Sequence, residues 1–318
     1  MSIAPLRRGT RPNSFGTSSE VRYEVLPLPD VEEQLVSSVD PGRSVTVTAS
    51  PKQGQQATFD LAERLVRYGF HVVPHISARL VVDRVHLKEL LDRAVGAGIS
   101  ELFVVAGDPA RPVGDYPDSL SVLRAMADLG YGLRSRPNAG SGPEPAPGPV
   151  SGLVTDQSTG STGFDQIGIA GYPEGHPKIS DDVLIQSMWD KKDFASYVVS
   201  QICFDPVVLS RWVRRLRERG IRQRLLVGVP GPSSVSRLLR ISKRVGVGDS
   251  MKFLGSHGAG MLRLVRPGQY TPDRMLDRLF ARCADELDGM HVYTFNNVAA
   301  AESWWVSRRA PTLLEIGA

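Results

Sequence analysis

The chain has 318 residues, of which 41% are hydrophobic, 23% charged and 7% aromatic. This composition is that of a globular protein with a sizeable core, and it excludes collagen, coiled coil and disorder as descriptions of the whole chain. The 38 Lys and Arg residues stand against 34 Asp and Glu residues, a net charge of +4. This positive charge is small, and the sequence has no recognisable nucleic-acid-binding motif. We therefore expect no nucleic-acid partner.

Other classes of protein are excluded by what the sequence lacks. Two cysteines, Cys203 and Cys283, are too few for a disulfide framework and have no metal-ligand spacing. No apolar run approaches the roughly 20 residues that span a bilayer, and the first twenty residues lack the apolar segment of a signal peptide. We therefore expect a soluble, cytoplasmic protein with no membrane partner.

After a Ser-, Gly-, Pro- and Arg-rich tail over residues 1–20, short β-rich runs alternate with segments of helical period. The runs are almost continuously apolar, as in parallel strands that are covered on both faces. Eight strands are predicted, at Val21–Pro27, Ser44–Ser50, His71–Ser77, Glu101–Asp108, Gln166–Pro173, Tyr197–Cys203, Arg224–Pro230 and Met290–Asn296.

The helical segments carry ordinary start and stop signals. Asp205 and Thr271 are predicted N-caps, and several segments end on a glycine. The predicted helices are Val31–Ser38, Thr58–Gly69, Asp83–Gly98, Asp118–Gly130, Asp181–Phe194, Asp205–Gly220, Ser233–Gly246 and Thr271–Leu287.

Eight strand–helix units in a chain of this length predict an α/β protein with a single-domain (β/α)8 TIM barrel, over residues 21–307. An open doubly wound sheet is the alternative, but no Gly-x-Gly-x-x-Gly follows the first strand. The Pro-, Gly- and Ser-rich residues 135–161 are predicted to form a flexible insertion. It connects a helix to a strand, on the barrel face away from catalysis, so we expect a loop or an oligomer contact rather than a lid. Residues 308–318 are expected to be a C-terminal tail.

Polar residues gather at the C-terminal ends of the predicted strands, where barrels of this kind carry their chemistry. Because polar groups from many strands converge on one rim, we expect a site for a large and chemically varied ligand. These residues are Glu24, Thr48, His75, Asp108, Tyr172, Glu174, His176, Gln201, Asp205, Tyr293 and Asn296.

Glu24 is the strongest candidate for acid–base chemistry. Its neighbours in sequence are apolar, and a carboxyl group in apolar surroundings has a raised pKa, which suits a general acid. The structural alternative is a rim carboxylate paired with Arg22 or Arg43.

The other rim residues have structural alternatives of their own. His75 fits a ligand contact and a core histidine bonded to a backbone carbonyl equally well. Asp108, between a glycine and a proline, fits an Asx turn. Gln201 is compatible with a buried amide, and Glu174 and His176 with a surface loop. The histidines show no metal-ligand pattern, so no metal is predicted, and no Ser or Cys stands in a nucleophile motif.

In order along the chain, these strand ends resemble the methylenetetrahydrofolate reductase family, in an atypical short bacterial form. The most specific pieces are Ala170-Gly-Tyr-Pro-Glu-Gly-His-Pro177 and Gln201-Ile-Cys-Phe-Asp205. The other pieces are Tyr23–Pro27, Val45–Thr48, Val73–Ile76, Ala106–Pro109 and His291–Asn296.

The resemblance implies a homo-oligomeric flavoprotein of one-carbon metabolism that serves methionine biosynthesis. NADH or NADPH reduces bound FAD, and the reduced flavin passes a hydride to 5,10-methylenetetrahydrofolate, in a ping-pong reaction that gives 5-methyltetrahydrofolate.

The resemblance also implies roles for single residues. Glu24 would be the general acid that assists opening of the methylene bridge to a 5-iminium ion. Asp108 would act catalytically between the flavin and the pterin, and Gln201 and Tyr293 would bind the folate. The FAD would be lined by Thr48, His75, Gly107, Asp108, Ala170, Tyr172, His176 and either Lys191 or Lys192, with Lys192 preferred.

The sequence departs from the family pattern at Leu28 in the first strand motif, in the insertion over 135–161, and at two positions that usually contact a ligand. Ala106 stands where an arginine that contacts FAD is usual, and Ile241 or a neighbouring leucine stands where a stacking phenylalanine is usual. A flavin-free reductase on the same barrel is therefore one alternative. A methyl-transfer protein that binds folate or pterin without a nicotinamide, and a catalytically degenerate paralogue with a binding or assembly role, are the others.

Overall fold

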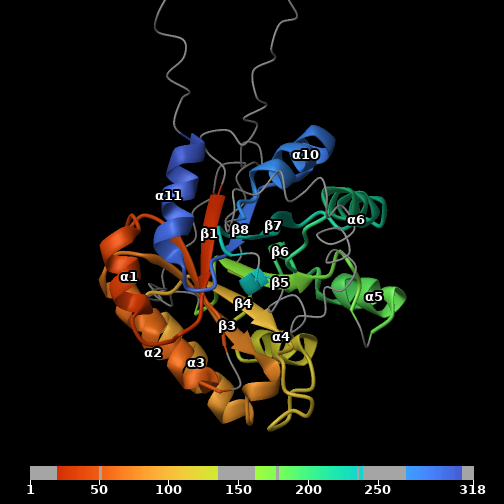
Figure 1. Cartoon of the computed structure of the whole chain (residues 1–318). Helices are drawn as coiled ribbons and strands as arrows, with labels where there is room; N and C mark the ends of the chain where they lie inside the picture. The colour runs from red at the N-terminus through yellow and green to blue at the C-terminus, as the bar shows by residue number, and fades with distance from the viewer. Residues whose placement is uncertain are drawn as a thin grey trace, which may run out of the picture.

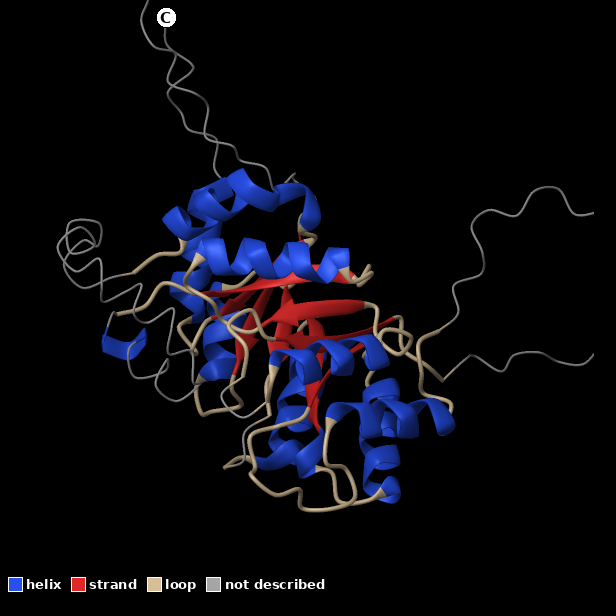
Figure 2. Ribbon diagram, turned by 90° about the vertical axis from the view of Figure 1, so that its right-hand side faces the viewer, coloured by secondary structure: helices blue, strands red, loops and turns tan. Residues whose placement is uncertain are grey.

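The computed structural model of the chain describes residues 20–49, 52–134, 162–176, 179–234, 236–238 and 270–309. Eight parallel strands hydrogen-bond in sequence order and close into one barrel, with helices around the outside (Figures 1 and 2). The predicted (β/α)8 barrel is confirmed. The insertion predicted at 135–161, most of the helix predicted at Ser233–Gly246, and Ile241 lie outside the described residues.

All eight predicted strands are present, and most end a few residues before the predicted limit. In the last strand the reason is visible, because Phe295 and Asn296 have positive φ angles of 52° and 58°, which end an extended ladder. The strands are β1 (Glu20–Val25), β2 (Ser44–Val47), β3 (His71–Ser77), β4 (Glu101–Val105), β5 (Gln166–Gly171), β6 (Tyr197–Ser200), β7 (Arg224–Pro230) and β8 (Gly289–Tyr293).

The helices also follow the predicted ranges, with two corrections. The helix after β8 was not predicted, although its buried residues Val298, Ala301, Trp304 and Trp305 recur at helical spacing. The N-cap predicted at Thr271 is also wrong, because the helix begins after Pro272. The helices are α1 (Val31–Ser38), α2 (Gly54–Arg67), α3 (Arg84–Gly96), α4 (Ser119–Asp128), α5 (Asp181–Lys191), α6 (Pro206–Glu218), α10 (Asp273–Cys283) and α11 (Val298–Arg309), with short 3-10 helices η1 (Ala78–Leu80) and η2 (Ala284–Glu286). None of the helices in the described ranges is long and apolar enough to cross a membrane.

Strand residues alternate between the barrel interior and the layer of helices, as the period of two requires. On β1, Tyr23 and Val25 belong to the large core between strands and helices, whereas Arg22 and Glu24 contact residues of other strands. A smaller apolar core fills the barrel interior, formed by Val73, Phe103, Tyr197, Val199 and Leu226. The alternation therefore places the carboxyl group of Glu24 inside the barrel.

A polar network occupies the N-terminal ends of the strands. The buried guanidinium of Arg22 lies 2.5 Å from a carboxylate oxygen of buried Glu101 and donates to the Tyr197 hydroxyl at 2.7 Å. Glu20 pairs with both Arg22 and Arg224. These charges fill the barrel end opposite to the rim where Glu24 lies.

Candidate active site at the C-terminal end of the barrel

Glu24, near the end of β1, lies between two histidines of other strands. Its Oε2 is 3.0 Å from Nε2 of His291 on β8 and 3.7 Å from Nε2 of His75 on β3. The ion pairs considered for Glu24 do not form, because Arg22 pairs with acids at the other end of the barrel and Arg43 pairs with Glu302. Glu24 is thus held by imidazole rings rather than by a guanidinium.

His75 is a buried histidine, but not one that is bonded to a backbone carbonyl. Its Nδ1 shares a hydrogen bond of 3.0 Å with the hydroxyl of Thr48, on the neighbouring strand β2. Its ring lies 4.7 Å from that of Phe103. Four side chains therefore form one chain of polar contacts across the barrel mouth, in the order Thr48, His75, Glu24 and His291.

These surroundings change the pKa of both Glu24 and His75. Burial is the strongest influence on Glu24 and raises its pKa, but the hydrogen bond and charge of His291, with the charge of His75, lower it overall. The raised pKa expected from apolar neighbours is therefore wrong for the protein without a ligand, because the two histidines are distant in sequence. Burial lowers the pKa of His75 to about 4, against the attraction of Glu24 and with the repulsion of His291. His75 is thus neutral near pH 7.

His291 belongs to one of the motifs that resemble the family, but it is not among the predicted site residues. It occupies the same face of β8 as Tyr293, and this period of two is the signal that would have selected it. Its ring is 1% exposed and 5.0 Å from the ring of Tyr293, and its Nδ1 is buried without a hydrogen-bond partner. Together Glu24 and His291 can hold a proton inside the barrel mouth and pass it to a ligand there.

A second group of predicted residues lies at the ends of β4 and β5. Gly107 has a φ of +91°, and a Cβ there would lie 1.9 Å from the hydroxyl oxygen of Ser77, so only glycine fits. Asp108 follows it, and the pKa of Tyr172 is raised by burial and by the charge of Asp108, against the charge of Arg79. Tyr172 also contacts His176 edge-on, with ring centres 5.5 Å apart.

The third group lies at the ends of β6 and β8. Gln201 accepts a hydrogen bond from the amide of Ile202 at 2.8 Å, which orients its amide group. The Tyr293 hydroxyl donates to the carbonyl of Ser200 at 3.1 Å. An apolar and aromatic cluster lies beside them, formed by Ile202, Phe204, Leu238 and Tyr270 with Tyr293 and Phe295 packed against it. The first four of these side chains are buried, and Tyr293 and Phe295 are partly exposed.

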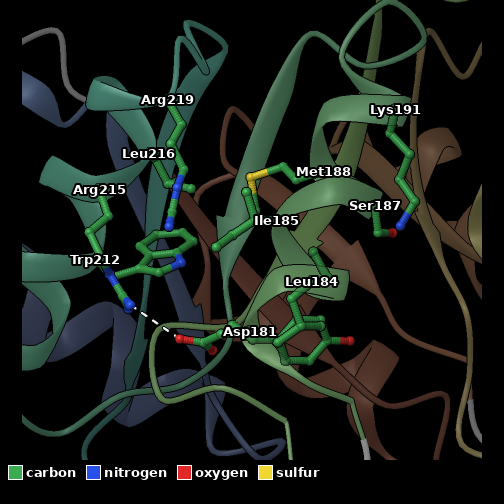
Figure 3. A pocket seen from close by; sticks show the side chains of 12 residues that line it. Asp181, Leu184, Ile185, Ser187, Met188, Lys191, Trp212, Arg215, Leu216 and Arg219 are labelled. Carbon is green, nitrogen blue, oxygen red and sulfur yellow. Dashed lines mark hydrogen bonds and ion pairs between the residues drawn. The ribbon is translucent and has the colours of Figure 1, made fainter.

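The two lysines proposed for the cofactor differ in position. Lys192 forms an ion pair of 3.1 Å with Asp193 and lies over the ring of Trp189. Lys191 lines a cavity between α5 and α6 that Ala170 and Tyr172 also line, and Figure 3 shows its side chain pointing toward Ser187. Burial lowers the pKa of Lys191, against the charges of Asp118 and Asp190. Lys191, and not Lys192, therefore lines the cavity beside Ala170 and Tyr172.

Two buried nitrogen atoms in the barrel mouth are compatible with the polar edge of a ligand ring such as that of a flavin. Nε2 of His75 and Nδ1 of His291 are buried there without hydrogen-bond partners, and a ring with a polar edge would satisfy such atoms. Ala106 offers no charged donor. Among the described residues, no group of three His, Cys, Asp or Glu side chains is placed to hold a metal ion.

Residues 153–252 match the family model of methylenetetrahydrofolate reductase, which confirms the resemblance over that stretch. Among solved structures, the chain is similar to a GH18 chitinase from Pseudoalteromonas aurantia, with 8% identity over 91% of this chain and 100% of that one and a TM-score of 0.49. It is also similar to an oxaloacetate acetylhydrolase bound to an inhibitor, with 8% identity, coverage of 93% and 82%, and a TM-score of 0.47. A putative lyase/mutase from Burkholderia cenocepacia J2315 shows 12% identity, coverage of 94% and 84%, and a TM-score of 0.46. These likenesses are too weak to carry an argument about the site.

Proposed function

We propose that this protein is a methylenetetrahydrofolate reductase, an oxidoreductase of the CH–NH group. It reduces 5,10-methylenetetrahydrofolate to 5-methyltetrahydrofolate with NADH or NADPH through bound FAD, in a ping-pong reaction. The observation that carries the proposal is Glu24 held between two buried histidines in the barrel mouth. The family match over residues 153–252 supports the substrate class. A cytoplasmic location and a homo-oligomeric state remain predictions.

FAD is the cofactor in this proposal, and when bound it supplies the hydride that reduces the folate. The predicted cofactor residues lie at neighbouring strand ends, with Lys191 taking the place of Lys192. The residues that would hold FAD are Thr48, His75, Gly107, Asp108, Ala170, Tyr172, His176 and Lys191.

The protein's own chemical contribution is a proton. When the methylene bridge opens to the 5-iminium ion, the departing nitrogen of the folate must gain one, and a positioned carboxyl group can supply it. His291 keeps the pKa of Glu24 low in the absence of a ligand. A folate over the mouth excludes water and strengthens burial, the influence that raises this pKa. Substrate binding thereby favours the acid form of Glu24.

The remaining residues orient the substrate. The Gln201 amide is fixed through its oxygen, which leaves its nitrogen to donate to the folate. Tyr293 is fixed through its hydroxyl and presents its ring edge beside His291. Asp108 lies near enough to Tyr172 for its charge to raise the pKa of that hydroxyl. Such positioning reduces the entropic cost of the reaction.

An anaerobic visible spectrum of the purified protein tests the proposal. We expect a flavin spectrum that bleaches with NADH and recovers when methylenetetrahydrofolate is added. A colourless protein that still oxidises NADH with the folate would support the flavin-free reductase. Folate binding without NADH oxidation would favour a methyl-transfer protein, and neither binding nor oxidation would favour the degenerate paralogue.

A further inference from the structure

The segment that carries Asp108 is tied to a neighbouring connection of the barrel. This segment, residues 106–117, leads from β4 to α4, and the connection from β3 to α3 lies beside it. The amide of Arg79 donates to the carbonyl of Ala106 at 2.9 Å, and the amide of Val113 donates back to the carbonyl of Arg79 at 3.1 Å. The amide of Asp115 donates to the carbonyl of Val82 at 3.0 Å.

The side chain of Arg79 adds two more bonds to the same segment. Its Nη1 donates to the carbonyl of Pro109 at 3.1 Å, and its Nε donates to the carbonyl of Pro117 at 2.9 Å. Pro109 directly follows Asp108, and Pro117 stands just before α4. One guanidinium group therefore holds both ends of the segment.

Two glycines allow the two connections to lie this close. A Cβ on Gly107 would lie 1.9 Å from the Ser77 hydroxyl oxygen, and a Cβ on Gly114 would lie 1.7 Å from the carbonyl oxygen of Val82. Neither position has room for a side chain. Asp108 is thus placed between a glycine packed on β3 and a proline whose carbonyl is held by Arg79.

Arg79 also brings a positive charge to this part of the rim from another element. The residue before Gly107 is the uncharged Ala106, and the cation of the segment itself, Arg111, is exposed. The charge of Asp108 raises the pKa of the Tyr172 hydroxyl, and the charge of Arg79 lowers it.

We propose that Arg79 is a positioning residue of this active site: it fixes the segment that carries Asp108 and supplies a positive charge beside it. Its effect on catalysis rests on the proposed function, in which Asp108 takes part, whereas its effect on the segment does not. The two effects can be measured separately.

Hydrogen exchange of the full chain tests the positioning without any substrate. In Arg79→Ala, we expect the amides of Val113 and Asp115 to exchange at least about tenfold faster, because they lose protection when the segment opens. Arg79→Lys, which keeps the charge and one donor group, should restore part of that protection. Arg217→Ala is the matched control, since Arg217 holds the carbonyls of Ile221 and Gln223 at the other end of the barrel. Unchanged exchange at both amides in Arg79→Ala would overturn the proposal.

A double-mutant cycle then tests the link to catalysis. We expect Arg79→Ala to lower kcat/KM for folate reduction about ten- to a hundredfold, as a misplaced catalytic group does. The same change in an Asp108→Ala background should have almost no further effect, because Arg79 acts through Asp108. Equal losses in both backgrounds would overturn the positioning role. If the wild-type protein reduces no folate, the proposed function fails, and the exchange rates still decide whether Arg79 fixes the segment.

Discussion

Two glutamates on one face of β1 show how far surroundings decide the role of a side chain. Glu20 lies at the start of the strand and pairs with Arg22 and Arg224, whereas Glu24 lies at the other end and contacts only imidazole partners among its ion pairs in the described residues. Guanidinium groups stay charged at all relevant pH values, whereas an imidazole has a neutral form as well as a charged one. Only Glu24 therefore has a partner with which to exchange a proton.

Glu24→Gln should separate the proposed chemistry into its two halves. The amide cannot supply a proton, so folate reduction should fall by about a hundredfold or more, while reduction of the flavin by NADH continues. Stopped-flow absorbance can follow the two half-reactions separately. Glu20→Gln changes the same side chain on the same face of the strand and should leave turnover near the wild-type value. Undiminished folate turnover in Glu24→Gln would remove Glu24 from the mechanism.

His75 should make the protein less stable as the pH falls. Its pKa is about 4 in the folded protein against 6.5 ordinarily, so between these values the unfolded chain binds a proton that the folded protein does not. Stability is full above pH 6.5 and declines toward pH 4; we expect a loss of about 2 kcal/mol between about pH 7 and about pH 5. Urea unfolding at several pH values measures it. His75→Asn should flatten the decline, and His71→Asn, at the exposed start of β3, should not.

At the scale of elements, two of the predicted rim residues serve as connections between parts of the fold. Asp205 caps α6 by accepting hydrogen bonds from the amides of Val207 and Val208 at 2.7 and 3.4 Å, as its predicted N-cap role requires. Asn296 accepts from the amide of Leu26 at 2.8 Å and donates to the carbonyl of the same residue at 3.0 Å. Asn296 thus connects the end of β8 to the end of β1, the two strands that carry His291 and Glu24.

Asp205→Ala should lower the free energy of unfolding by about 1 kcal/mol, because the first turn of α6 loses its side-chain acceptor. Ser180→Ala is a matched comparison, since Ser180 stands at the N-cap of α5 and makes no capping hydrogen bond. Denaturant unfolding of both variants gives the difference. Equal stability of the two variants would show that the Asp205 bonds do not stabilise the helix.

At the scale of the whole molecule, the barrel has an apolar interior between two polar ends. Arg22 and Glu101 are each only 1% exposed at the N-terminal end, and the ring of Tyr197 lies 4.4 Å from the guanidinium carbon of Arg22. Burying these charges on folding costs free energy, and the cost is offset only while each charge keeps its partner of opposite charge. Loss of either side chain alone should therefore weaken the barrel more than loss of both.

Arg22→Met should cost about 3 to 5 kcal/mol of unfolding free energy, because it leaves the carboxylate of Glu101 buried without its cation. Adding Glu101→Met removes the unpaired charge and should recover most of that loss. Urea unfolding of the two single variants and the double variant measures the coupling between them. Additive losses would contradict a direct interaction between the two charges.

The sequence alone determined the order and approximate limits of the strands and of most helices. Apolar runs and closing glycines are local signals, and eight repeats of strand and helix leave few arrangements besides a closed barrel. The helix α11 was missed although its apolar residues recur at helical spacing. The residues of the rim could be predicted for a related reason. In a closed barrel of parallel strands, the C-terminal ends of all strands lie together at one end of the barrel.

Which side chains meet on that rim follows from the three-dimensional fold and not from the sequence pattern. Glu24 and His291 are 267 positions apart in the chain, and no spacing in the sequence relates them. The neighbours of Glu24 in sequence are apolar and predicted a raised pKa, but its neighbours in space are two imidazole rings that lower it. An inward-facing side chain in a barrel takes its partners from other strands, so its chemistry depends on how the barrel closes and not on the residues next to it.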